Sequence, residues 1–173
     1  MIISKTWAMP NSKTFSIKPI KSFVGKYICD KQMVIDPFAN DCKYGHITND
    51  LNPEFDTNYH LDALTFLKQM PSNMADCVLF DPPYSITQAA TMYKSFGKDK
   101  LEINVANMKY WSSCKDEIAR ILVDGGIALS FGWNSNGLGK SRGFVCQEIL
   151  LVAHGGSKND TICVSEVKCN NEE

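Results

Sequence analysis

The sequence lacks any apolar run that approaches the ~20 residues needed to cross a bilayer. Its first ten residues, MIISKTWAMP, contain no long apolar stretch, so no secretion signal is expected. Internal repeats and low-complexity segments are also missing. The chain has 173 residues, of which 44% are hydrophobic and 21% charged, as in globular domains. We therefore expect one domain spanning 1–173, in a cytoplasmic protein with no membrane partner.

The cysteines and histidines lack the spacing of a disulfide framework or a metal site. There are seven cysteines, an odd number, and no pair has Cys-x-x-Cys spacing. Several, such as Cys77 and Cys163, lie within apolar runs, which is typical of reduced core thiols. The three histidines show no ligand spacing. The sequence predicts no metal site.

The net charge is only −1, so the chain lacks the strong positive charge of many nucleic-acid-binding proteins. The charge is uneven, however. The first 31 residues contain six lysines but a single acid, Asp30. Two further basic clusters follow: Lys94, Lys98 and Lys100 in one, Lys140 and Arg142 in the other. Each cluster is either a solvated loop or a surface that contacts phosphates.

Apolar periodicity and turn residues divide the chain into strands and helices. Residues 1–31 are expected to be irregular, with Pro10 and Pro19 as breakers. The predicted strands are 33–35, 46–49, 75–80, 127–133, 144–153 and 161–167. The predicted helices are 61–70 and 112–126, the second capped by Ser112 or Ser113 and ended by Gly125.

This order of elements predicts an α/β fold with a mostly parallel sheet and a C-terminal antiparallel hairpin at one edge. Asp36, Asp50 and Asp81 would then lie just past the carboxyl ends of three parallel strands. Open α/β sheets bind ligands at that edge. One such acid could merely cap a loop, but three at equivalent positions favour a binding site.

The stretch CVLFDPPY, residues 77–84, ends an apolar strand with an acid, two prolines and an aromatic. Proline cannot donate to a sheet ladder, and the residue before it is held extended, so Asp81 is fixed at the end of the strand. A carboxylate, the carbonyl of Pro82 and the flat ring of Tyr84 form a preorganised clamp for a planar amine. A base within a duplex would have to flip out to reach it.

The Asp81-Pro82-Pro83-Tyr84 motif resembles the catalytic motif of the S-adenosylmethionine-dependent amino methyltransferases, especially the DNA adenine-N6 enzymes. VIDPFAND (34–41) is similar to their first cofactor motif, ITNDLNPE (47–54) to the acidic turn after the next strand, and YHLDALTFL (59–67) to the following one. The likeness spans 32–168 and is greatest to small phage-type enzymes. It implies a Rossmann-like methyltransferase fold and S-adenosyl-L-methionine as cofactor.

The resemblance also implies roles for single residues. Asp36 and Phe38 would lie near the methionine part of the cofactor, Asp50 would accept from the ribose hydroxyls, and Asp62 would accept from the adenine amine unless it is only a helix N-cap. TFSIKPI (14–20) would help to enclose the methionine end. The implied cofactor-binding residues are Asp36, Pro37, Phe38, Asn40, Asp50, Leu51, Asn52, Asp62 and Ala63.

Two features depart from the family pattern. Asn40-Asp41-Cys42 stand where glycines are usual, and Asp36 and Asp50 are only 14 residues apart. A parallel crossover normally needs a dozen or more residues, usually with a helix. The helix between these two strands must therefore be very short or absent.

The chain has no separate segment long enough to be a target-recognition domain. Only residues 85–111 lie between the catalytic motif and the predicted helix 112–126, enough for a lid or a nucleic-acid-contacting segment. Nucleic-acid contact is expected from Tyr93, Lys94, Lys98, Lys100, Lys140 and Arg142. A homodimer or a partner chain could supply target recognition.

The favoured reading is transfer of a methyl group to adenine N6 in DNA, by a prokaryotic or phage enzyme. Cytosine N4, RNA adenine or a glutamine amide are alternative acceptors, and Asp81 rather than serine or asparagine favours adenine. A non-catalytic methyltransferase-like subunit that binds nucleic acid or a partner is the reading from another class.

Overall fold

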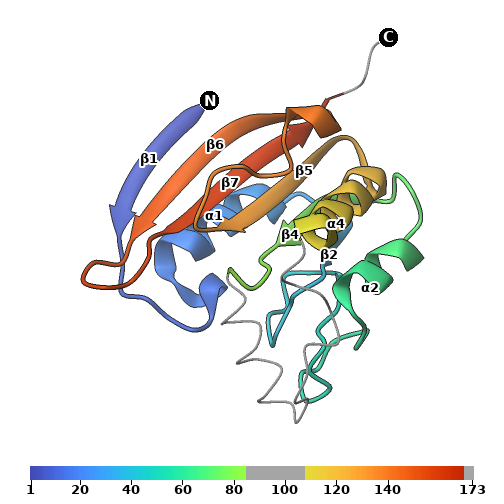
Figure 1. Ribbon diagram of the computed structural model, residues 1–173, viewed down its shortest axis with the longest axis horizontal. Coiled ribbons are helices and arrows are strands. Elements are labelled where there is room, and N and C mark those ends of the chain that lie inside the picture. Colours follow the sequence, from blue (N-terminus) through green and yellow to red (C-terminus); the bar gives the residue numbers. More distant parts are fainter. Residues whose placement is uncertain (85–107, 170–173) are drawn as a thin grey trace.

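The computed structural model describes residues 1–84 and 108–169, which form a seven-stranded sheet with helices on both faces (Figure 1). The strand order is β1-β6-β7-β5-β4-β2-β3. The strands are β1 (Ile2–Trp7), β2 (Val34–Asp36), β3 (Ile47–Thr48), β4 (Ala75–Phe80), β5 (Leu122–Gly132), β6 (Phe144–Ala153) and β7 (Thr161–Lys168). The helices are η1 (Thr14–Ser16), α1 (Lys18–Ile28), α2 (Ala63–Gln69), α4 (Met108–Ile121) and η2 (Lys140–Arg142).

The sheet is mostly parallel, which confirms the predicted fold class. All pairs from β3 to β5 are parallel, and only β7 runs antiparallel to its neighbours β5 and β6. The predicted β6–β7 hairpin is present, and β1 adds outside it as a parallel edge strand. The connection between β2 and β3, residues 37–46, is fully described and contains no helix. This agrees with the prediction from the short distance in sequence between Asp36 and Asp50.

Alternating side chains along the strands build two cores, one on each face of the sheet. On β4, Cys77 and Leu79 face the core that α1 covers, whereas Val78 and Phe80 face the core that α2 and α4 cover. Strands buried on both faces read as continuous apolar runs, which is why β4 was recognisable in the sequence. The molecule therefore has three layers, with α1 on one face of the sheet and α2 and α4 on the other. The carboxyl ends of β2 and β4 belong to the middle layer.

The prediction that residues 1–31 are irregular was wrong. They contain β1, η1 and α1. Pro19 lies at the first positions of α1, where the missing N–H would have no helical partner in any case, so it begins this helix instead of breaking it. Ile20, Phe23 and Val24 are the buried face of α1.

The helix predicted at 112–126 begins earlier and ends sooner. α4 starts at Met108, so Ser112 and Ser113 lie within it and do not cap it. Gly125, at φ 77°, belongs to the irregular start of β5, where pairing with β4 passes from Leu122 to Ile127. Residues 108–111 of the segment predicted as a lid therefore belong to α4.

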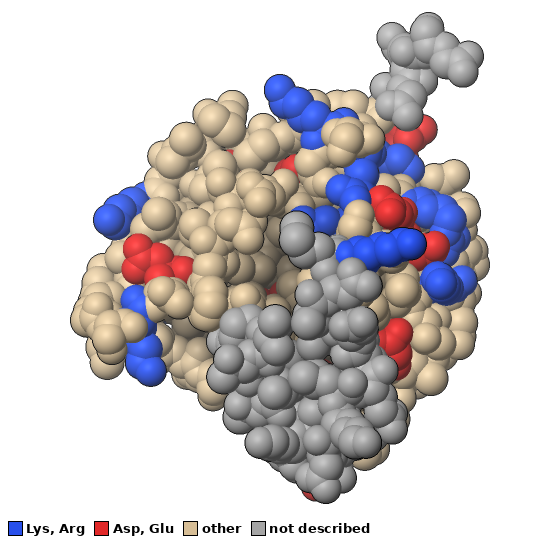
Figure 2. Space-filling view, viewed as in Figure 1, with Lys and Arg blue, Asp and Glu red and all other residues tan. Residues whose placement is uncertain are grey.

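Over the described ranges, no helix combines the length and apolar character that crossing a membrane requires. In Figure 2 basic and acidic side chains alternate on the side that carries α4. Among the described residues, α4 contributes Glu117 and Asp116 to ion pairs with Arg120 and Arg142.

Candidate functional site

Three acids that the sequence placed at one edge of the sheet do lie there. Asp36 ends β2, Asp50 follows β3, and Asp81 follows β4. The chain leaves β2 toward β3 on one side, whereas β4 pairs with β2 on the other, so the ends of β2 and β4 form a topological switch point. Ligands bind to open α/β sheets at such points.

Asp36 is completely buried, and only one of its carboxyl oxygens has a partner. Its Oδ1 accepts from the backbone N–H of Phe38 at 3.1 Å, whereas Oδ2 is buried with no hydrogen-bond partner in the described part of the chain. Burial raises the pKa of Asp36 to about 8, and the nearby Asp81 and Asp50 carboxylates add to this shift. A buried oxygen in this state favours a ligand that donates a hydrogen bond or carries positive charge.

Asp50 holds the loop that follows β2. Its Oδ2 accepts from the N–H of Asn40 at 2.9 Å, and its Oδ1 accepts from the N–H of Asn52 at 2.9 Å. Burial raises the pKa of Asp50. Each carboxylate oxygen accepts one bond here and retains a further lone pair, so the side chain can still receive hydroxyl donors.

Asn40 replaces glycine in the glycine-rich position of the family pattern. Its φ is +50°, in the left-handed region that asparagine tolerates better than most residues. The loop therefore keeps a glycine-like turn without glycine. Phe38, two residues before, packs its ring against Phe80 and Trp111, with centroids 5.8 and 6.1 Å away.

The remaining predicted cofactor residues lie along the same edge. Leu51 is half-buried and Asn52 is buried. Asp62 is the N-cap of α2 and accepts from the N–H of Thr65 at 3.0 Å, a structural role that does not exclude the predicted contact with the adenine amine. The Asp62 carboxylate also accepts from the hydroxyl of Tyr110. The carbonyl of Pro37 accepts from the side-chain amide of Asn49 at 3.1 Å. Ala63 is buried at the start of α2.

Asp81 accepts a hydrogen bond from Tyr84, the last residue of the same motif. Tyr84 Oη donates to Asp81 Oδ1 at 2.5 Å, and the Thr14 side chain also hydrogen-bonds to Asp81. Burial is the largest influence on the Asp81 carboxyl and raises its pKa to about 6, against the lowering effect of these hydrogen bonds. The Asp81 carboxyl is therefore mostly ionised at neutral pH.

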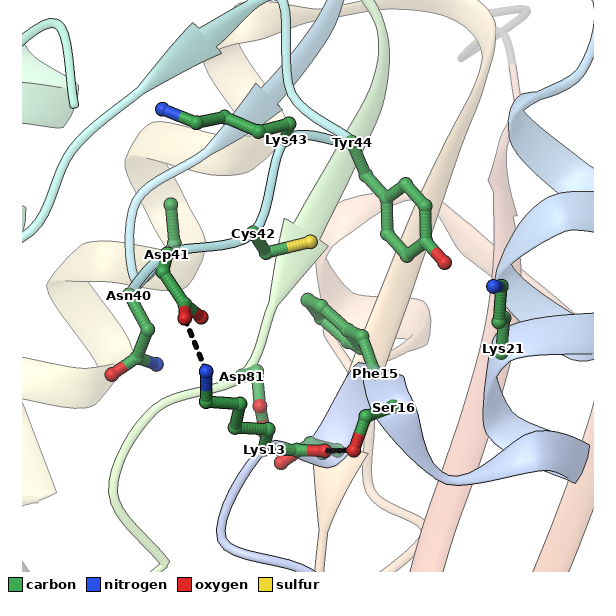
Figure 3. Close-up of a pocket in the computed structure, with 12 residues that line it drawn as sticks. Lys13, Phe15, Ser16, Lys21, Asn40, Asp41, Cys42, Lys43, Tyr44 and Asp81 are labelled. Atoms are coloured by element: carbon green, nitrogen blue, oxygen red, sulfur yellow. Dashed lines mark hydrogen bonds and ion pairs between the residues drawn. The ribbon is translucent and has the colours of Figure 1, made fainter. Parts of the chain in front are cut away.

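A pocket of about 360 Å³ opens beside Asp81, between the loop after β2 and the segment that contains η1 (Figure 3). Phe15 and Tyr44 give it an aromatic wall, with ring centroids 6.0 Å apart. In Figure 3 Lys13 reaches from the η1 side to Asp41, with which it forms an ion pair. The full lining is Lys13, Thr14, Phe15, Ser16, Lys21, Ala39, Asn40, Asp41, Cys42, Lys43, Tyr44 and Asp81.

The sequence analysis identified only part of this lining. The segment TFSIKPI was expected near the methionine end, and Thr14, Phe15 and Ser16 do line the pocket. Lys13, Lys43 and Tyr44 were missed, and no motif marks them. Asn49 was missed as well, although its buried side chain joins the ends of two loops through Pro37 and Leu61.

Of the predicted nucleic-acid contacts, only Lys140 and Arg142 belong to the described part of the chain, and neither lies at this edge. Tyr93, Lys94, Lys98 and Lys100 lie outside the described residues. Lys140 and Arg142 precede β6, which runs parallel to β5, so they lie at the opposite edge of the sheet from Asp81. Arg142 donates to Asp116 and Ser112 of α4 and to the carbonyl of Leu138, which makes it a structural residue in this arrangement.

Across 1–84 and 108–169, no group of three or more His, Cys, Asp or Glu side chains is placed to hold a metal ion.

No protein-family model matches the chain, and no curated protein matches it in sequence. Solved structures do match it in fold. A 1,6-didemethyltoxoflavin-N1-methyltransferase from Burkholderia thailandensis, solved with S-adenosylhomocysteine, is 11% identical and has a TM-score of 0.60, over 88% of this chain and 78% of that one. The N-methyltransferase NodS from Bradyrhizobium japonicum is 7% identical with a TM-score of 0.56, over 93% and 100%.

TrmN from Thermus thermophilus is 14% identical with a TM-score of 0.54, over 88% of this chain and 49% of that chain. The present chain thus spans about half the length of TrmN. At these identities the likeness defines the fold, which is that of the S-adenosylmethionine-dependent methyltransferases.

Proposed function

We propose that this chain transfers a methyl group from S-adenosyl-L-methionine to the exocyclic N6 amine of adenine in DNA. The observation that carries the proposal is the position of Asp81-Pro82-Pro83-Tyr84. In a methyltransferase-type sheet, this motif follows β4 at the switch point, and its Asp81 borders the pocket beside β2. The sequence resemblance to adenine-N6 enzymes supports the choice of acceptor.

The residues at this edge suit the proposed cofactor. Asp36 offers a buried oxygen without a partner among the described residues, and the cationic amino-acid end of the cofactor, bound there, would favour release of the proton that Asp36 holds in the free protein. Lys13 and Lys43 line the pocket and, on leaving their ion pairs with Asp41 and Asp56, could pair with the carboxylate of the cofactor. Asp50 retains lone pairs for ribose hydroxyls, and Leu51 and Asn52 follow it directly.

The chemistry that remains for the protein concerns the acceptor amine. When bound, S-adenosyl-L-methionine supplies a methyl group on a sulfonium, so that a nitrogen–carbon bond forms, a sulfur–carbon bond breaks and the amine loses one proton. Asp81, ionised at neutral pH, accepts a hydrogen bond from that amine and can take up its proton. Pro82 presents a carbonyl of fixed direction to the second N–H. The Tyr84 hydroxyl must leave Asp81 Oδ1 when the amine takes its place.

We also propose which part of the molecule recognises the target sequence. The described residues contain only the sheet and its covering helices, so we assign sequence reading to residues 85–107 or to a partner chain, which a homodimer could provide. A target adenine within a duplex would be flipped into the site, because a stacked base cannot reach Asp81.

Nucleoside analysis tests the proposal directly. Purified protein would be incubated with S-adenosyl-L-methionine and duplex DNA, single-stranded DNA, RNA or a glutamine-containing peptide. Each nucleic-acid product would be digested to nucleosides, and all products would be examined by mass spectrometry. We expect N6-methyladenine from DNA, and none from the matched Asp81→Ala protein. N4-methylcytosine, methylated RNA or methylated glutamine peptide would replace the proposed acceptor. Cofactor binding without transfer to any acceptor would favour the non-catalytic reading.

A further inference from the structure

The two sides of Asp81 differ in what they offer a ligand. On the side of β2, the loop 39–44 and the segment 13–16 form the pocket assigned above to the cofactor. On the other side β4 pairs with β5, and Phe80 lies opposite Ser130. Phe131 and Gly132 follow Ser130 and end β5, and Trp133 comes directly after the strand. The approach to Asp81 from the side of β5 therefore passes the end of that strand.

Trp133 is the first residue after β5 and is 41% exposed. Its ring contacts that of Tyr84 edge-on, with centroids 5.9 Å apart and planes at 68°. Tyr84 in turn donates to Asp81, and it lies against Gly132, where an added Cβ would be 4.0 Å from Tyr84 Cδ1. Trp133 is thus separated from the Asp81 carboxylate by one side chain, with much of its indole open to solvent.

The chemistry of group transfer gives this exposed indole a position in the reaction. An attacking nitrogen approaches the methyl carbon from the side opposite the sulfur that leaves. With the cofactor on the β2 side of Asp81, the acceptor must come from the β5 side, where Trp133 lies. An aromatic face binds planar rings of any sequence by stacking, whereas an aliphatic amide presents no such ring.

We propose that Trp133 contacts the acceptor and stacks against its ring, so that the acceptor of this site is an amine on a planar heteroaromatic ring, of the nucleobase class. This inference rests on the proposed function and adds to it the residue that would recognise the acceptor's ring. Asp81 selects the amine, and Trp133 selects the ring that bears it. An aliphatic glutamine amide would use the first contact but gain nothing from the second.

Kinetics of three variants test the role of Trp133. Trp133→Phe keeps an aromatic face, Trp133→Leu keeps an apolar side chain without one, and Trp7→Phe changes another exposed tryptophan, on the edge strand β1. We expect Trp133→Leu to lower kcat/KM for an adenine-containing oligonucleotide about tenfold or more, mainly through KM, which corresponds to about 1.4 kcal/mol. Trp133→Phe should remain within about threefold and Trp7→Phe should equal the wild type. Calorimetric cofactor affinity should be the same in all four proteins.

A binding measurement separates failure of this inference from failure of the proposed function. With S-adenosylhomocysteine present, an adenine-containing single-stranded oligonucleotide should quench tryptophan fluorescence in the wild type and much less in Trp133→Phe. Quenching confined to Trp133 supports ring stacking even if no N6-methyladenine is produced. Equal quenching in both proteins, or a kcat/KM for Trp133→Leu within twofold of a wild type that methylates adenine, overturns it. Preference of the wild type for a glutamine peptide overturns it as well.

Discussion

At the scale of single residues, two buried carboxyl groups at the same edge of the sheet hold their protons with different strength. The pKa of Asp36 is raised to about 8 and that of Asp81 to about 6, in both cases chiefly by burial. Asp81 receives hydrogen bonds from Tyr84 and Thr14 that favour its charged form, whereas within the described ranges Asp36 receives one, from the backbone of Phe38. At neutral pH Asp81 is mostly ionised, whereas Asp36 is mostly protonated.

The charge of Asp81 makes methyl transfer dependent on pH. Because its pKa is about 6, we expect kcat/KM of the wild type to rise with pH through that value and then to level off. Asp81→Asn removes the acceptor of the proton and should lower kcat by about 10²–10⁴-fold, the usual contribution of a general base. Initial rates from pH 5 to 9 measure both effects. Activity of Asp81→Asn within a few-fold of wild type would contradict the role of the carboxylate.

The proton on Asp36 makes stability dependent on pH. The folded-state pKa of about 8 exceeds the unfolded value of 3.8, so the folded protein holds a proton that the unfolded chain releases. Between about pH 4 and 8 the free energy of unfolding should therefore fall as pH rises, by at most about 1.4 kcal/mol per pH unit. Asp36→Asn keeps an acceptor for the Phe38 N–H but cannot ionise.

Urea unfolding of wild type and Asp36→Asn at pH 5, 7 and 9, without cofactor, measures this dependence. We expect similar stability at pH 5 and a variant that is more stable by a few kcal/mol at pH 9. A constant difference between the two proteins at all three values would show that Asp36 is ionised throughout.

At the scale of elements, one buried carboxylate fixes the connection between β5 and β6. Glu166 of β7 is 4% exposed and accepts from the backbone N–H groups of Leu138 and Gly139, the second at 3.1 Å. The backbone of Gly137 lies in close contact with the Glu166 carboxylate, since an added Cβ would lie 2.1 Å from Glu166 Oε2. The connection is therefore held by contacts that only the folded sheet provides.

Alanine at two glycines separates backbone strain from this close contact. Gly137 and Gly125 both have positive φ, at 52° and 77°, but an added Cβ at Gly125 meets nothing within 4 Å. We expect Gly125→Ala to lower the free energy of unfolding by about 1–2 kcal/mol, the cost of a left-handed conformation. Gly137→Ala should cost a further 1–3 kcal/mol, roughly the cost of overpacking. Equal losses in denaturant unfolding would mean that Glu166 moves away without cost.

The elements show where sequence patterns predict well and where they do not. β4, β6 and β7 were predictable because long apolar runs bounded by turn residues have few alternatives. α1 was missed because Pro19 and the lysines around it suggested a loop, whereas the buried positions Ile20, Phe23 and Val24 decide the helix. The end of α4 was misplaced because Gly125 can serve equally as a helix stop or in an irregular strand.

The residues of the candidate site also fall into those that the sequence could predict and those that it could not. Asp36, Asp50 and Asp81 could be placed because strand ends fix them, and local sequence determines strand ends. Lys13 and Tyr44 could not, because they reach the pocket from segments whose path depends on packing against the sheet. Asp62 was left with two readings, and its cap contact with Thr65 does not decide between them, since its other oxygen meets Tyr110.

At the scale of the whole molecule, cofactor binding should stabilise the folded chain. At a concentration of 100 times Kd a ligand adds about 2.7 kcal/mol, which for a domain of this size raises Tm by roughly 5–10 °C. Asp50→Asn should lower Tm without ligand, because Asp50 holds both Asn40 and Asn52, and should also reduce the rise with S-adenosyl-L-methionine. Thermal scans with S-adenosylhomocysteine and with ATP as a control complete the measurement. An unchanged rise would limit Asp50 to its structural bonds.

The position of β1 has a consequence for the order in which the protein is made. β1 is formed by residues 2–7, yet its sheet partner is β6, with Ile2 opposite Glu148 and Trp7 opposite Ala153. β6 joins the rest of the sheet only through β7. During translation the backbone groups of β1 must wait for their sheet partners until β6 has been made, next to Ile2, Ile3 and Trp7, whose side chains stay exposed even in the folded protein. Apolar strands that stay unpaired for long are prone to bind other chains. Nascent chains stalled before residue 144 should therefore retain chaperones that the released protein no longer binds.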